Sequence, residues 1–130
     1  MIAADTNLLL RYFVKDNDAQ TRSVTRWLTE RTADDPVFVS MIVLCELVWA
    51  LRSRYRYPPD RVRELLIAML ETEEIVLEDE AAISTILASG RKTDFSDEII
   101  AYISRRAGCR VTMTFDQEAA AMVPSMELLS

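Results

Sequence analysis

Apolar and polar positions along the chain form short blocks whose spacing predicts strands and helices in turn. Apolar residues at helical spacing predict helices over residues 7–14, 19–31, 41–54, 61–71, 80–88, 96–106 and 117–122. Short apolar or β-branched runs predict strands over residues 1–4, 37–39, 75–77, 111–115 and 126–129. Strands that alternate with helices usually form a parallel sheet with helices on both faces. We therefore expect an α/β protein, a three-layer α/β/α fold with a mainly parallel central sheet of about four to five short strands.

The length and composition favour a single domain over residues 1–130. Half of the residues are hydrophobic, which is enough for an ordinary core. No apolar run approaches the roughly 20 residues that span a bilayer, and no basic region precedes the apolar run around Asp5, which argues against a signal peptide. Cys45 and Cys109 show no ligand-like spacing. These features predict a reduced, cytoplasmic protein without a membrane partner.

The charge restricts the chemistry. A net charge of −6 has the wrong sign for binding nucleic acid through bulk charge alone. Among the cations only Lys15 and Lys92 are lysines, and the rest are arginines, which bind phosphate in a bidentate manner. The chain has no histidine, so imidazole acid–base chemistry and the commonest transition-metal ligand are excluded.

Carboxylates follow two of the predicted strands. Asp5 and Asp116 each come where a strand ends and a helix begins, which is the edge of an α/β sheet where ligands bind. The alternative is that each caps the helix that follows it. Neither has Glu or Gln three residues on, so no capping box favours that alternative.

Three further acids complete the set. Glu46 lies in a run that is otherwise apolar or Cys, so we expect a largely buried helix around it and a cation to neutralise it, either a metal or an arginine. Asp94 and Asp97 lie three residues apart at a helix start, where acids also complement the helix dipole. Acids from four segments, with no histidine among them, suit Mg²⁺ or Mn²⁺ over zinc. Such a cluster is typical of metal-dependent nucleases.

The same segments resemble the acidic motifs of PIN domains. The matching stretches are Asp5-Thr6-Asn7, Glu46 within VLCELVWALRSRY, Asp94-Phe95-Ser96-Asp97 before EIIAYISRRAGC, and Thr114-Phe115-Asp116. The small size resembles the VapC-type toxins of toxin–antitoxin pairs. That resemblance implies Mg²⁺-dependent RNA cleavage, with Mn²⁺ as a possible substitute, a homodimer, and inhibition by a cognate antitoxin.

The resemblance also implies roles for individual residues. Asp5 and Asp97 would ligate the metal directly, while Glu46 and Asp116 would complete its shell and orient the attacking water. Supporting positions would be Thr6, Asn7, Asp94 and Thr114. The run Ala119-Ala120-Ala121 departs from many relatives, which have a bulkier or charged residue there.

Arginine and tyrosine interleave before Pro58-Pro59, at a predicted helix end. This stretch is a candidate RNA contact, as is the pair that precedes Asp94; the residues are Arg52, Arg54, Tyr55, Arg56, Arg91 and Lys92. Cations at a helix C-terminus beside packing tyrosines are an equally good interpretation of the first group. Apolar side chains lie on most sides of the predicted helix over residues 7–14. Some of them could line an antitoxin groove, although burial in the core is the simpler explanation.

Two other classes of protein also have an acidic site of this kind. A phosphatase of the haloacid dehalogenase type needs an Asp where Asn7 stands, and a receiver-type phosphoacceptor domain needs paired acids and a lysine that are missing from those places. A PIN-like module that binds metal, RNA or protein without catalysis is the remaining alternative.

Overall fold

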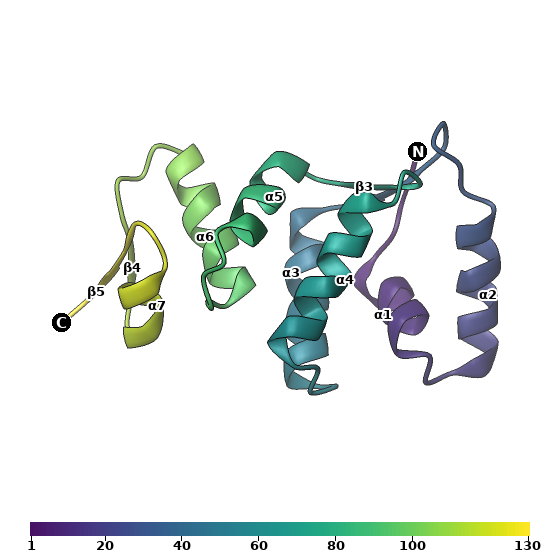
Figure 1. Ribbon diagram of the computed structural model, residues 1–130, viewed down its shortest axis with the longest axis horizontal. Coiled ribbons are helices and arrows are strands. Elements are labelled where there is room, and N and C mark those ends of the chain that lie inside the picture. Colours follow the sequence, from purple (N-terminus) through teal and green to yellow (C-terminus); the bar gives the residue numbers. More distant parts are fainter. The chain divides into compact units, whose positions relative to one another are not determined.

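The computed structural model describes residues 1–130, which form two compact units, Met1–Glu80 and Ala81–Ser130. Figure 1 shows the alternation of short strands and helices that the hydrophobic pattern predicts.

The first unit contains three strands and four helices. They are β1 (Ile2–Ala3), α1 (Thr6–Val14), α2 (Asp18–Thr29), β2 (Val37–Val39), α3 (Met41–Ser53), α4 (Pro59–Glu71) and β3 (Ile75–Leu77). The strands form one parallel sheet in the order β1-β2-β3, with Ile2 paired to Val37 and Phe38 paired to Val76. Because the strands are parallel, their carboxyl ends lie at one edge of the sheet, and Asp5 and Ser40 follow there.

The core of the first unit comes from the central strand and from one face of each long helix. Helix α1 packs against α2 and α3, α3 packs against α4, and α4 packs against β3. Fully buried side chains include Leu9, Val37, Val39, Leu44, Leu47, Leu51, Leu66 and Met69. Strand β1 lies at the edge of this sheet, and both of its residues are exposed.

The second unit contains α5 (Glu80–Ala88, which starts on the last residue of the first unit), α6 (Phe95–Arg106), β4 (Thr112–Thr114), α7 (Gln117–Met122) and β5 (Met126–Leu128). Strands β4 and β5 pair in parallel, and α7 connects them and packs on both. A small apolar cluster joins α6 to this βαβ element through Ala101, Ala119, Val123 and Met126. The guanidinium of Arg105 strengthens the junction by donating to the Pro124 carbonyl oxygen at 3.0 Å and to the Ser125 hydroxyl at 2.8 Å.

Most helix boundaries agree with the sequence pattern to within two residues, and the differences follow from capping. Asn17 caps α2 by accepting the Gln20 amide, so that helix begins at Asp18. Pro58 occupies the cap position of α4, which places Asp60 inside the first turn. All strand pairs are parallel, as expected, and hydrogen bonding divides the strands into a three-stranded and a two-stranded sheet.

Candidate active site

Asp5 occupies the N-cap of α1, directly after β1. Its Oδ1 accepts the Leu8 amide at 2.9 Å, so the helix-cap interpretation of this residue is confirmed. The side chain is exposed, and the capping bond uses Oδ1. The cap therefore holds the carboxylate in one orientation and leaves one oxygen for a ligand. Thr6 and Asn7 form the first turn of the same helix.

Glu46 lies on an exposed face of α3, so the expectation that it is buried was wrong. Ile42, Glu46 and Trp49 are spaced at helical intervals on that face, while Leu44 and Leu47 lie on the buried side. Ile42 is 74% exposed and Trp49 is 60% exposed. A helix that is apolar on all sides gives no sign in its sequence of which face packs. Because the Glu46 side chain is exposed to water, its charge needs no neutralising partner.

Asp116 repeats the arrangement of Asp5 in the second unit. It follows β4 and caps α7, with Oδ1 accepting the Ala119 amide at 2.9 Å. Its own amide donates to the Thr114 hydroxyl at 3.0 Å, so Thr114 helps to set the direction of this residue. The side chain is exposed, and the capping bond again uses Oδ1.

Asp94 and Asp97 lie at the start of α6. Asp94 caps the helix through Oδ1 and the Ser96 amide at 2.8 Å, and Asp97 lies in the first turn. Burial raises the pKa of Asp97 above its ordinary value, and the negative charges of Asp94, Asp116 and Glu98 raise it further. These carboxylates therefore repel one another in the absence of a cation.

The predicted acids are divided between the two units, with Asp5 and Glu46 in the first and Asp94, Asp97 and Asp116 in the second. Within either unit, no group of three or more side chains of the His, Cys, Asp or Glu type is placed closely enough to hold a metal ion.

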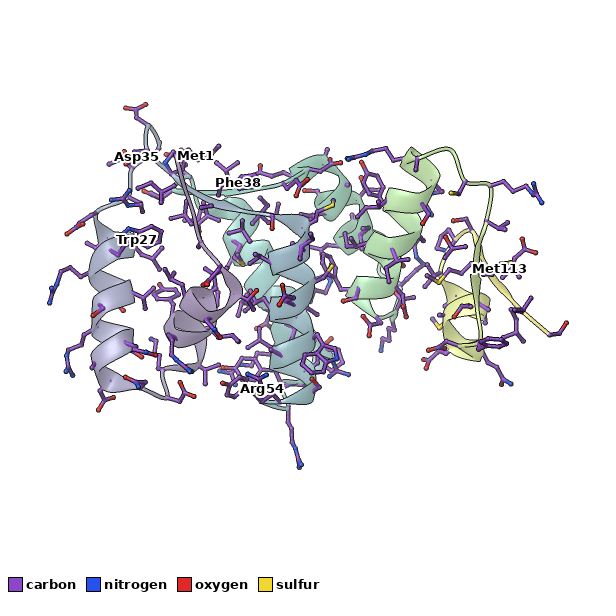
Figure 2. The ribbon with its side chains drawn as sticks, turned by 180° about the vertical axis from the view of Figure 1, so that it is seen from behind. Met1, Trp27, Asp35, Phe38, Arg54 and Met113 are labelled. Atoms are coloured by element: carbon purple, nitrogen blue, oxygen red, sulfur yellow. The ribbon has the colours of Figure 1, made fainter.

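The arginine and tyrosine stretch at the end of α3 is partly committed to contacts within the protein. Arg52 donates from Nη1 to the Tyr57 carbonyl oxygen at 3.0 Å. The Tyr55 hydroxyl lies 3.5 Å from an oxygen of Asp16. Arg54 and Arg56 are exposed, and Figure 2 shows Arg54 at the end of this helix. Arg52 and Tyr55 thus contact groups of the protein itself, while Arg54 and Arg56 have the exposure that a phosphate contact requires.

Sequence reasoning missed Glu98, which is the one buried charged side chain of the chain and is 1% exposed. Arg91 binds it in a bidentate manner, with Nε to Oε1 at 2.7 Å and Nη2 to Oε2 at 3.0 Å, and the Thr93 hydroxyl donates to Oε1 at 2.9 Å. Arg91 is therefore chiefly an anchor for the loop that leads to Asp94, while Lys92 remains exposed. An acid at helical spacing between Phe95 and Ala101, which are both buried, was the available signal.

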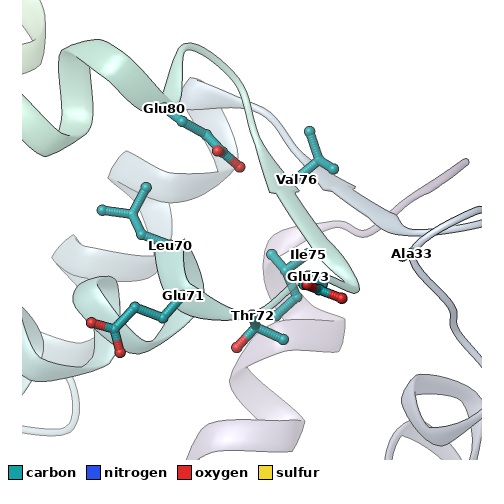
Figure 3. Close-up of a pocket in the computed structure, with 8 residues that line it drawn as sticks. All are labelled: Ala33, Leu70, Glu71, Thr72, Glu73, Ile75, Val76 and Glu80. Atoms are coloured by element: carbon teal, nitrogen blue, oxygen red, sulfur yellow. The ribbon is translucent and has the colours of Figure 1, made fainter.

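A hollow of about 470 Å³ lies between Ala33 and the segment that joins α4 to β3 (Figure 3). Glu71, Glu73 and Glu80 are among its lining residues. Most of the lining precedes β3 or belongs to it, so the hollow lies toward the end of the sheet opposite to Asp5. Its acidic lining would repel phosphate.

Comparison with protein-family models matches residues 2–123 to the PIN domain. The chain therefore belongs to the PIN domain family, a nuclease-type fold that usually uses divalent metals and acts on nucleic acids. The match confirms the predicted fold class, a PIN-like α/β/α fold with parallel strands. A search of curated protein sequences found no match. None of the helices is both long and apolar enough to cross a membrane.

Proposed function

We propose that this protein is a Mg²⁺-dependent endoribonuclease and the toxin of a toxin–antitoxin pair. The observation that carries the proposal is the PIN match over residues 2–123, which contains all four predicted acids, Asp5, Glu46, Asp97 and Asp116. We further propose that residues 1–130 form a single PIN domain, and that Mn²⁺ can replace Mg²⁺.

The donor set fits a hard divalent cation. Asp5 and Asp116 each use one oxygen for a helix cap and keep the other, and the chain has no histidine that would favour a softer metal. Burial and then the charges of neighbouring acids raise the pKa of Asp97, and a cation would relieve the repulsion among these charges. When bound, it would supply an activated water and neutralise charge on the phosphodiester.

Each acid has a proposed role. Asp5 and Asp97 are the direct ligands, and Glu46 and Asp116 complete the ligand set and orient the attacking water. Thr6, Asn7, Asp94 and Thr114 support these groups; the Thr114 hydroxyl, which accepts the Asp116 amide, is the clearest example. Arg54, Arg56 and Lys92 are exposed cations suited to the RNA backbone.

Cleavage of a mixed RNA pool by the purified chain tests the enzyme assignment. We expect cleavage with Mg²⁺, loss of cleavage with EDTA, and a loss of at least about a hundredfold for Asp97→Asn. Asp60→Asn is the matched control, because Asp60 is also an acid in the first turn of a helix but lies outside the predicted acid set. Cleavage that survives both EDTA and Asp97→Asn would refute the proposed site.

The toxin assignment, with its cytoplasmic location, homodimer and cognate antitoxin, is supported by the sequence resemblance to VapC-type toxins. Expression of the chain alone should arrest growth, and Asp97→Asn should relieve the arrest. Light scattering should give twice the chain mass of 14.9 kDa. If cells that express the chain grow normally although the purified chain cleaves RNA, the toxin assignment is refuted and the enzyme assignment is not.

A further inference from the structure

A groove of about 420 Å³ lies between α1 and α2, beside Asp5. Its lining combines apolar groups with polar ones, and it includes Asn7, Leu8, Arg11, Gln20, Val24 and Trp27. Figure 2 shows Trp27 on the side of α2 that faces α1. We propose that this groove binds one nucleobase of the RNA, next to the scissile phosphate; the inference rests on the proposed function.

The groove begins within one helical turn of a proposed metal ligand. The Leu8 amide donates to Asp5 Oδ1 at 2.9 Å, and Leu8 itself lines the groove. A phosphate held at Asp5 therefore has its neighbouring base within reach of α1 and α2. No other described hollow has this relation to Asp5, because the acidic hollow beside β3 lies toward the opposite end of the sheet.

The polar wall presents oriented hydrogen-bonding groups. Arg11 donates from Nε to Gln20 Oε1 at 2.6 Å and from Nη1 to Asp16 Oδ1 at 2.9 Å. The first bond fixes the Gln20 amide with its NH₂ group left to donate elsewhere. Glutamine is one of the side chains that read the edges of bases.

Trp27 supplies the aromatic surface. Val24, one turn away on α2, is buried beneath the groove. The guanidinium of Arg31 lies 5.2 Å from the centre of the Trp27 ring and restricts the ring, and its Nη1 is paired with Asp35 Oδ2 at 2.9 Å. An unpaired base can stack on such a surface while the polar atoms along its edge form hydrogen bonds with the polar side of the groove. A purely apolar peptide side chain would desolvate Arg11 and Gln20 without replacing their hydrogen bonds, so the lining favours a base.

Nuclear magnetic resonance of the full chain tests the groove without requiring cleavage. The two tryptophans give two indole N–H signals, and Trp49 on α3 serves as the internal control because it lies on another helix. The probes are the four nucleoside 5′-monophosphates, added in EDTA. We expect a saturable shift of the Trp27 signal with at least one of them, and little change at Trp49. No saturable shift at Trp27, or equal shifts at both tryptophans, would overturn the proposal.

Steady-state cleavage gives a second measurement. Trp27→Ala should raise KM for RNA by about tenfold, the effect of losing one base stack, with little change in kcat, and Trp27→Phe should largely restore KM. A fall in kcat that Trp27→Phe does not rescue would indicate a structural role only and would overturn the proposal. If no variant or wild-type sample cleaves RNA, the proposed function fails, while the indole shifts still decide whether the groove binds a base.

Discussion

The buried pair between Glu98 and Arg91 allows a stability prediction that can be worked from its contacts. Glu98 is 1% exposed and accepts two hydrogen bonds from Arg91 and one from Thr93. Burial by itself raises the pKa of Glu98, but the hydrogen bonds from Arg91 and Thr93 and the charges of Arg91 and Arg105 bring it below its ordinary value of 4.5. The carboxylate is therefore held ionised in the folded protein.

Arg91→Ala should be strongly destabilising because it leaves this carboxylate buried with only the Thr93 hydroxyl. Removing one partner of a buried pair typically costs about 3–5 kcal/mol of unfolding free energy. Glu98→Gln removes the charge and keeps the shape, so it should cost about 1–2 kcal/mol. The double variant buries a neutral amide where the charge stood, and it should be about 2 kcal/mol more stable than Arg91→Ala alone.

Urea unfolding followed by circular dichroism measures these differences in EDTA. Arg110→Ala is the matched control, since Arg110 is exposed and belongs to none of the ion pairs, and it should change stability by less than about 0.5 kcal/mol. If the double variant is as unstable as the sum of the two single variants, the charge of Glu98 is not what makes Arg91 necessary.

The pH dependence of the pair has a definite sign. In the wild type the folded pKa of Glu98 is lowered, so its contribution is present above the unfolded value of 4.5 and is lost as the pH falls through the folded value. In Arg91→Ala the pKa of Glu98 should be raised, because burial is no longer offset by Arg91. Protonation then removes the unpaired buried charge and its cost to stability. The stability difference between the two proteins should therefore narrow as the pH is lowered from 7 toward 4.

Two further predictions concern the proposed site and the core. Because the folded pKa of Asp97 is raised above 3.8, ionisation of this group opposes folding above that pH; Asp97→Asn should therefore raise Tm in EDTA at pH 7, and the gain should disappear near pH 3. An unchanged or lower Tm at pH 7 would contradict the repulsion among these acids. Leu47→Ala should cost about 2–5 kcal/mol in chemical unfolding, since Leu47 is fully buried, whereas Ile42→Ala on the exposed face of the same helix should cost less than about 1 kcal/mol. Equal losses would mean that the two faces of α3 are assigned wrongly.

The sequence alone determined the order of elements, the α/β class and the places where acids follow strands. These follow from local physics, because a period of two or 3.6 in apolar residues marks an element, and an Asp at a strand end caps the helix that follows. Asp5 and Asp116 illustrate this, since the capping bonds join residues three positions apart. The family match over residues 2–123 confirms that the chain resembles PIN domains.

Only the tertiary structure decided which face of an apolar helix is covered and which charge is buried. Glu46 sits in an apolar run yet is exposed, whereas Glu98 sits among other acids yet is buried. The difference depends on Arg91, seven residues away, which folds back to neutralise Glu98, while nothing needs to neutralise Glu46. The cost of burying a charge depends on which groups the fold brings to it, and periodicity along the chain does not contain that information.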